Sequence, residues 1–222
     1  MNQTGEIYRW DVLGHYVSGP EELALDVAPG EHRFLSVDLC QLPPSLYVRI
    51  RVAKDAHLTI YERGEDRNAH YGNITVHLQG EGASVNYQIR ARSQADERQE
   101  ITHDIYHEAS HTSSQIRTRA VLKDTSFLSY EDRIHVAKGA RQCYGEQHLK
   151  ALLFSQRAKL HTTPNLEIRN QNVQSKHGVS IKYLDTEWLF YLQSRGLSEE
   201  RARELVEEGV LAFPEEHTES HV

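Results

Sequence analysis

Residues 83–89 read Ala83-Ser84-Val85-Asn86-Tyr87-Gln88-Ile89, a small residue and a polar residue followed by apolar residues at every second position. Alternation with a period of two turns one set of side chains inward and the other outward, which is typical of a half-buried β-strand. The small residue before the strand suits a tight corner of the chain. The segment therefore predicts a strand that starts at a corner.

The same alternation recurs through the middle of the chain, and short turns rather than amphipathic helices separate its copies. This excludes a βαβ sheet, whose crossover helices would show a period of 3.6. A sandwich of hairpins and a solenoid of stacked coils both fit the alternation. Asn-Gly and Asp-Gly, which hairpin turns prefer, do not occur, so the repeated corner favours the solenoid. The alternating segments are 48–52, 58–61, 74–78, 85–89, 116–121 and 134–136, and the corner phrase recurs at 56–58 and 158–160.

Composition limits the compartment and the partners. Hydrophobic residues make up 38% of the 222 residues, and the net charge of −7 repels phosphate, so nucleic acid is not an expected partner. No apolar stretch has the roughly 20 residues that a membrane-spanning helix needs. Residues 1–10 lack an apolar signal-peptide segment, so we expect a cytoplasmic protein. Cys40 and Cys143 are too few for a disulfide framework and are expected as reduced, partly buried thiols.

Near its C-terminal end the sequence changes to helical signals. Asp185 is a suitable N-cap for a helix over 186–195, Gly196 suits the position after it, and Ser198 caps a second helix. We therefore expect a β-helix core over 1–183, followed by a helical hairpin and acidic tail over 184–222. The predicted apolar stripe of the second helix is Ala202, Leu205, Val206 and Leu211, and its predicted outer face carries Arg203, Glu204, Glu207 and Glu208.

The first helix contains an unusual run, Trp188-Leu189-Phe190-Tyr191-Leu192. A helix of this length cannot bury five large side chains against one neighbour. Some would pack on the solenoid and others on the second helix. Those left exposed would form an aromatic patch that anchors another protein.

Histidines suggest a metal site without establishing one. His103, His107 and His111 are spaced by four, so they would share a face on one strand or one helix. Imidazoles this close could bind zinc or iron. Because neither a cysteine nor a His-Glu-x-x-His pattern accompanies them, a solvated or interfacial histidine ladder is the favoured interpretation. Asp104 and Glu108 are expected on the opposite face of the strand.

Enzyme motifs are missing from the sequence. It contains no Walker A sequence, no Gly-x-Gly-x-x-Gly and no Gly-x-Ser-x-Gly, and none of its scattered carboxylates lies in an apolar context that predicts a raised pKa. A carbohydrate-active hydrolase on a β-helix would need clustered carboxylates on one coil face, for which Asp124, Glu131 and Asp132 are the candidates. His177-Gly178 follows a polar turn, where the histidine could cap a corner or handle metal or sulfur near an interface.

Several C-terminal motifs resemble those of one family. Residues 164–168 read Pro-Asn-Leu-Glu-Ile, residues 189–196 read Leu-Phe-Tyr-Leu-Gln-Ser-Arg-Gly, and residues 147–158 carry Gln147, Leu152-Leu153-Phe154-Ser155 and Ala158. These segments are similar to Pro-x-Leu-Glu-Ile, Leu-Phe-Tyr-Leu-x-Ser-Arg-Gly and Gln-x-x-x-x-Leu-Leu-Leu-Ser-x-x-Ala of the SufB/SufD family, which assembles iron–sulfur clusters. Residues 111–123 fit the preceding coil, so the resemblance covers about 100–215.

This resemblance implies a right-handed parallel β-helix followed by a helical module, in a non-catalytic component of an iron–sulfur cluster assembly complex. It implies docking on a SufC-like ABC-type ATPase through the C-terminal helices, and pairing through the β-helix with a second copy or a SufB-like paralogue. It implies no tightly bound cofactor, only a transient iron–sulfur cluster or iron. The expected ATPase contacts are Trp188, Leu189, Phe190, Tyr191, Leu192 and Arg195.

Departures from the family pattern matter for cluster binding. The family's Asp-Val-x-Cys-Ser-His-Gly is here 172–178, Asn-Val-Gln-Ser-Lys-His-Gly, and Ile168 stands where the scaffold branch has a cysteine. Because thiolate is the natural ligand of iron, the chain resembles SufD more than SufB, and His177 is the only candidate ligand that carries over. The usual N-terminal helical extension is missing, because β patterning begins before residue 50. An iron carrier that uses His103, His107, His111 or His177 is the alternative.

Overall fold

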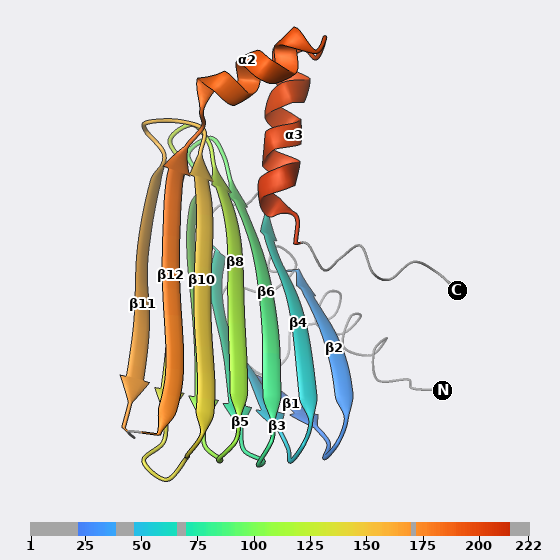
Figure 1. The fold of residues 1–222 in the computed structure, drawn as a ribbon, viewed down its shortest axis with the longest axis vertical. Coiled ribbons are helices and arrows are strands. Elements are labelled where there is room, and N and C mark those ends of the chain that lie inside the picture. The colour runs from blue at the N-terminus through green and yellow to red at the C-terminus, as the bar shows by residue number, and fades with distance from the viewer. Residues whose placement is uncertain (1–21, 39–46, 66–69, 170–171, 214–222) are drawn as a thin grey trace, which may run out of the picture.

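Two six-stranded parallel sheets face each other across one core, and successive coils of the chain contribute one strand to each (Figure 1). The structure, a computed structural model, describes residues 22–38, 47–65, 70–169 and 172–213. The first sheet contains β1 (Glu22–Val27), β3 (Tyr47–Val52), β5 (His70–Leu78), β7 (Arg98–His107), β9 (Phe127–Val136) and β11 (Lys159–Ile168). The second contains β2 (His32–Asp38), β4 (His57–Glu65), β6 (Ser84–Ser93), β8 (Ser113–Leu122), β10 (Cys143–Leu153) and β12 (Val173–Tyr183).

This arrangement confirms the predicted parallel β-solenoid, because every strand pair within the two sheets is parallel. The register also places apolar side chains of successive coils directly opposite one another. Ile50 of β3 lies opposite Val76 of β5, which lies opposite Ile105 of β7, and all three side chains are buried. Burying each such side chain contributes roughly 1.5–3 kcal/mol, and most of the core consists of these columns.

Small residues form the corners, as the sequence predicts. Ala56, Ala83 and Ala158 are all buried, where a larger side chain would meet the adjacent coil. Backbone hydrogen bonds join successive corners, since the amide of Ser84 donates to the carbonyl of Ala56 at 2.9 Å. Each corner therefore fixes the position of the next coil.

The turns from the first sheet to the second repeat a left-handed residue. This position is occupied by Gly30, Asp55, Gly82, His111 and Gln142, with φ between 53° and 75°. Glycine adopts this conformation without strain, whereas other residues pay a steric penalty. His111 therefore belongs to a turn and not to β7, so the expectation that it shares a strand face with His103 and His107 is wrong.

Two helices follow the solenoid, α2 (Thr186–Ser194) and α3 (Glu199–Leu211). They lie beyond the C-terminal ends of the strands of the second sheet, along one side of the solenoid, and α3 contacts β8 and β10 (Figure 1). Neither helix is long and apolar enough to cross a membrane.

The turn position of His111 can be tested by substitution. His111→Gly should preserve or slightly raise the free energy of unfolding, because glycine relieves the left-handed strain at this residue. His111→Val should lower it by roughly 1–2 kcal/mol, because a branched side chain is least compatible with a positive φ. Urea titration of both variants measures the difference. Equal losses for Gly and Val would mean that the imidazole itself contributes to the fold.

Candidate functional site

The two helices are capped as predicted. The side chain of Asp185 accepts a hydrogen bond from the amide of Glu187 at 2.8 Å, and Ser198 accepts one from the amide of Arg201 at 3.2 Å. Gly196, with φ of +92°, ends the first helix and allows the chain to turn into the second. These caps satisfy backbone donors that a helix start otherwise leaves without partners, so they stabilise the first turns of both short helices.

The aromatic run on α2 divides into one buried residue and three exposed ones. Leu189 is buried, whereas Trp188, Phe190 and Tyr191 are 44%, 74% and 56% exposed. Leu192 is half-buried and Arg195 is exposed, with its guanidinium 5.3 Å from the centre of the Tyr191 ring. The expected division between packing and exposure is therefore present, and Trp188, Phe190 and Tyr191 supply the exposed side chains. We call these three residues the aromatic patch.

α3 is fixed to the solenoid by an acidic residue that we expected on its outer face. Glu207 is buried, and its carboxylate pairs with Arg92 of β6 and with Lys123 after β8. The prediction that Glu207 faces solvent is wrong because these two cations draw it inward. Ala202 and Leu211 of the predicted apolar stripe are buried as expected.

A second apolar surface lies at the C-terminal end of the solenoid. Among the described strands, β11 and β12 each pair with one neighbour only, so no further described coil covers their inward-facing side chains. Ile168 of β11 and Val179, Ile181 and Tyr183 of β12 are exposed for this reason. We call these four residues the open end.

His177 belongs to the same row of β12 as the residues of the open end. It lies opposite Gln147 in the middle of the strand and is exposed. The interpretation of His177 as a corner-capping residue is therefore wrong. Its imidazole faces the same side as the exposed apolar residues, where a second protein could reach it.

His103 lies inside the solenoid and bridges two carboxylates. Its Nε2 lies 2.9 Å from an oxygen of Glu62, and its Nδ1 lies 3.1 Å from an oxygen of Asp132. Tyr87 donates a hydrogen bond to Glu62, and Tyr130 donates to Asp132 at 2.6 Å. Since both ring nitrogens face carboxylate oxygens, both must donate, and the ring is an imidazolium.

This cluster contradicts two expectations from the sequence. His103 and His107 are fully buried, so they do not form a solvated histidine ladder. Glu62 and Asp132 lie in the core, although no carboxylate was expected in an apolar context. Burial alone would lower the pKa of His103, but Glu62 and then Asp132 outweigh it and raise that pKa from 6.5 to about 10.

His107 has the opposite electrostatic environment. Burial lowers its pKa from 6.5 to about 4, because only hydroxyl groups meet its ring nitrogens, Thr112 and Ser114 at 2.8 Å each. Thr112 donates its own proton to the carbonyl of Ala109 at 3.0 Å, so it accepts from Nδ1–H, and Nε2 accepts from Ser114. His107 is therefore a neutral core residue rather than a ligand.

The predicted metal and hydrolase groups are not brought together. Among the described residues, no three histidine, cysteine, aspartate or glutamate side chains form a group that could hold a metal ion. Asp124 lies in a turn and accepts a hydrogen bond from the amide of Ala95, Glu131 points outward from β9, and Asp132 points inward. These three acids share no coil face. Cys143 is buried and free, and Cys40 lies outside the described residues.

The fold and these surfaces define a class of protein, a parallel β-solenoid whose exposed apolar side chains lie at its open end and on a terminal helix pair. Residues 46–210 match the model of the SufBD core domain of the SUF system for FeS cluster assembly. The chain therefore belongs to the SufB/SufD family.

Relatives from both branches of the family match the chain. It is 30% identical over 141 residues to the iron-sulfur cluster assembly protein SufB of Bacillus subtilis, an alignment that covers 64% of this chain and 30% of the relative. It is 26% identical over 148 residues to the iron-sulfur cluster assembly protein SufD of Escherichia coli, with 67% and 34% covered. The chain thus spans about a third of the length of these relatives.

The two core histidines predict a stability maximum near pH 6.5. The pKa of His103 is raised by folding, so its contribution is complete below about pH 6.5 and is lost as the pH rises towards about 10. The pKa of His107 is lowered, so its contribution is complete above about pH 6.5 and is lost as the pH falls towards about 4. Urea unfolding across pH 4–10 measures both limbs.

Substitutions test which histidine causes the acid side and which the alkaline side of this pH dependence, called here the acid limb and the alkaline limb. His103→Gln should lower the free energy of unfolding by roughly 3–5 kcal/mol at pH 6.5, because it leaves two buried carboxylates without their cation, and should flatten the alkaline limb. If that variant does not fold, Glu62→Gln removes one side of the bridge and should also reduce the alkaline slope. His107→Gln should flatten the acid limb only. An unchanged alkaline limb in the His103 and Glu62 variants would contradict the ion-pair assignment.

Proposed function

We propose that this chain is a non-catalytic component of an iron–sulfur cluster assembly complex. In this proposal the aromatic patch of α2 docks on a SufC-like ABC-type ATPase. The open end pairs with a second β-solenoid, either another copy or a SufB-like paralogue. Family membership supports the assembly role, and the exposure of three aromatic side chains on one short helix carries the docking proposal.

The physical argument for ATPase docking is the cost of leaving the aromatic patch in water. Aromatic side chains provide much of the binding energy at protein interfaces, and Arg195 extends the patch with a cation beside Tyr191. Leu189 anchors the helix from its other side. The patch can therefore bind a groove on a partner without unpacking α2 from its own subunit.

The argument for solenoid pairing is geometric. A parallel solenoid ends in two strands whose outer edges have no partner, and exposed strand edges readily pair with another chain. Here those edges belong to β11 and β12, which also expose Ile168, Val179, Ile181 and Tyr183. A second solenoid placed against this end would satisfy both the edges and the apolar row.

In this proposal, His177 is the residue of the interface that would act as an iron ligand. It lies in the same row of β12 as Ser175, which stands where the family pattern has a cysteine, so neither residue supplies a thiolate. One imidazole and one hydroxyl per chain make a weak site, so a cluster or iron would be held transiently and with ligands from the partner. Anaerobic reconstitution of the chain alone should give substoichiometric iron. A stoichiometric cluster on the isolated chain would favour a carrier function instead.

The docking proposal predicts the effect of truncating side chains of the aromatic patch to alanine. Phe190→Ala together with Tyr191→Ala should abolish co-purification with the ATPase and leave the melting temperature nearly unchanged, because both side chains are exposed. Phe34→Ala on β2 is a matched control, since Phe34 is 63% exposed but distant in sequence from the helices. Retained ATPase binding by the double variant would contradict the proposal, as would equal loss in the control.

The pairing proposal predicts the effect of a charge at the open end. Ile181→Arg should convert the dimer, formed alone or with the paralogue, to monomers, because it buries an unpaired cation in the interface. Lys182→Glu changes the charge at the next residue, which points to the other face of β12, and should leave the dimer intact. Light scattering after size-exclusion chromatography measures the mass. A dimer that survives Ile181→Arg would show that pairing uses another surface.

A further inference from the structure

The outer face of the second sheet carries a row of cations across four adjacent strands. Lys150 of β10 lies opposite Arg119 of β8, Arg119 lies opposite Arg90 of β6, and Arg90 lies opposite Arg63 of β4. Adjacent strands are about 4.8 Å apart, and like charges directly opposite each other destabilise a sheet. The chain maintains this row although its net charge is −7.

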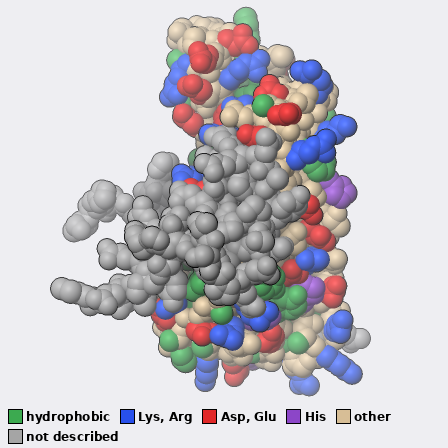
Figure 2. Space-filling model, turned by 180° about the vertical axis from the view of Figure 1, so that it is seen from behind, with side chains coloured by type: hydrophobic (Ala, Val, Ile, Leu, Met, Phe, Trp, Pro, Cys, Tyr) green, Lys and Arg blue, Asp and Glu red, His purple; other side chains and the backbone are tan. Residues whose placement is uncertain are grey.

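On the first sheet, two outward-facing arginines form ion pairs with carboxylates of the adjacent strand. Arg133 of β9 pairs with Asp104 of β7 through two contacts of 2.8 Å, and Arg51 of β3 pairs with Asp26 of β1 at 2.6 Å. Seen from the side opposite to Figure 1, acidic and basic side chains are intermixed (Figure 2). These two pairs neutralise cations across strands of the first sheet, whereas the row on the second sheet places cation opposite cation.

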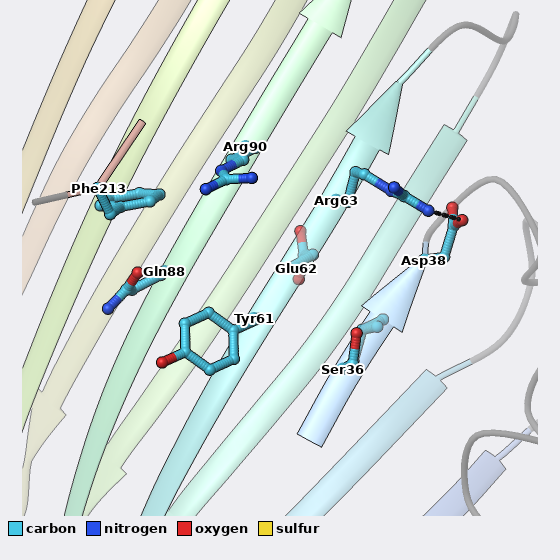
Figure 3. A pocket seen from close by; sticks show the side chains of 9 residues that line it. Ser36, Asp38, Tyr61, Glu62, Arg63, Gln88, Arg90 and Phe213 are labelled. Atoms are coloured by element: carbon cyan, nitrogen blue, oxygen red, sulfur yellow. Dashed lines mark hydrogen bonds and ion pairs between the residues drawn. The ribbon is translucent and has the colours of Figure 1, made fainter. Parts of the chain in front are cut away.

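Two carboxylates pair with cations in or beside this row. Asp38 pairs with Arg63 at 2.9 Å, as Figure 3 shows at the edge of a pocket of about 230 Å³. At the other side, Glu207 of α3 is occupied by Arg92 and Lys123. Arg119 and Lys150, the half of the row on β8 and β10, receive neither of these carboxylates.

Arg119 and Lys150 lack an ion pair anywhere in the described part of the chain. The Phe213 ring lies 5.6 Å from the Arg119 guanidinium and 5.7 Å from that of Arg90, so it contributes a cation–π contact but no charge. Burial, and then the neighbouring charge of Arg117, lower the pKa of Arg119. Arg119 and Lys150 therefore lie on adjacent strands with no ion pair from the described residues to offset their repulsion.

A cleft opens over these side chains. Arg117, Arg119, His148 and Lys150 line a volume of about 310 Å³ between β8 and β10. Glu146 of β10 lies outside this lining, where the Tyr144 hydroxyl donates to it at 2.5 Å, His148 contacts it at 2.7 Å and Arg117 interacts with it electrostatically. The described lining of the cleft thus contains no carboxylate, and its Arg119 and Lys150 have no ion pair among the described residues.

We propose that this cleft binds the phosphate group of a small phosphorylated ligand. Guanidinium groups form paired hydrogen bonds with phosphate oxygens, and a lysine supplies an additional point charge. In this assignment the Arg119 guanidinium donates to the phosphate, and Lys150 neutralises the remaining charge. The bound anion removes the repulsion between these two cations, so it stabilises the sheet as well as being recognised by it.

Pyrophosphate and ATP serve as probes in isothermal titration of the full chain, with sodium chloride matched for ionic strength. The variant Arg119→Gln with Lys150→Gln should lose affinity about tenfold or more, because each contact to a charged group is worth about a factor of ten. Lys176→Gln with Lys182→Gln is the matched control, since it removes two charges from β12 outside the cleft and should bind as the wild type does. Tighter binding of pyrophosphate would identify a free phosphate ligand, and tighter binding of ATP a nucleotide.

Thermal unfolding gives an independent measurement. Without added anion, Arg119→Gln with Lys150→Gln should be at least as stable as the wild type, because it relieves repulsion. Pyrophosphate should stabilise the wild type and the Lys176→Gln with Lys182→Gln control but not the Arg119→Gln with Lys150→Gln variant. The proposal is overturned if neither probe binds above the chloride control, or if both double variants lose affinity equally. Binding of poly-glutamate without binding of phosphate would overturn it too, because the cleft would then recognise an acidic polypeptide.

Discussion

Stacking is the constraint on which this molecule depends. Each strand of the solenoid forms its hydrogen bonds with the coil before it and the coil after it, and each inward side chain packs in a column of equivalent residues. Interior coils therefore satisfy both their backbone and their apolar side chains. A final coil has a neighbouring coil on one side only. Its outer strand edges and part of its apolar surface therefore stay exposed, and such an end can pair with another chain.

The core is not simply apolar, and its polar residues follow the same stacking. Glu62, His103 and Asp132 come from three different coils and meet in the interior, where they join the two sheets through charged hydrogen bonds. Such a cluster is costly when any member is missing, because the remaining charges are buried. It therefore makes coil register specific in a way that interchangeable Val, Ile and Leu columns do not. His107, held neutral by two hydroxyl groups, shows that burial alone has the opposite effect on a histidine.

Much of the fold could be predicted because alternation and small corner residues report directly on strand direction. The same alternation held information that we did not use. Glu62 is in phase with Leu58 and Ile60, and His103 is in phase with Ile101 and Ile105, so both were predictably inward. By contrast, the partners of these groups come from other coils, and their register depends on turn lengths that a single sequence does not fix. The equal spacing of His111 was misleading because it comes from the turn repeat and not from the strand.

The helix pair illustrates a similar limit. Caps and apolar stripe were readable because they are local, and the division of the aromatic run into Leu189 inward and Phe190 outward follows helical geometry. Glu207 was misplaced because its attraction to Arg92 and Lys123 is a tertiary effect. The basic row was hidden for the same reason, since its members are far apart in sequence and the net charge is negative.

Amide hydrogen exchange at β12, measured while the protein is diluted, tests most directly whether the last coil needs a partner. The account predicts that exchange of β12 amides accelerates as the solenoid pair dissociates, while amides of the interior strand β8 stay protected at every concentration. Protection of β12 that does not change with dilution, at a level equal to that of β8, would contradict it, because the last coil would then be complete without a second solenoid.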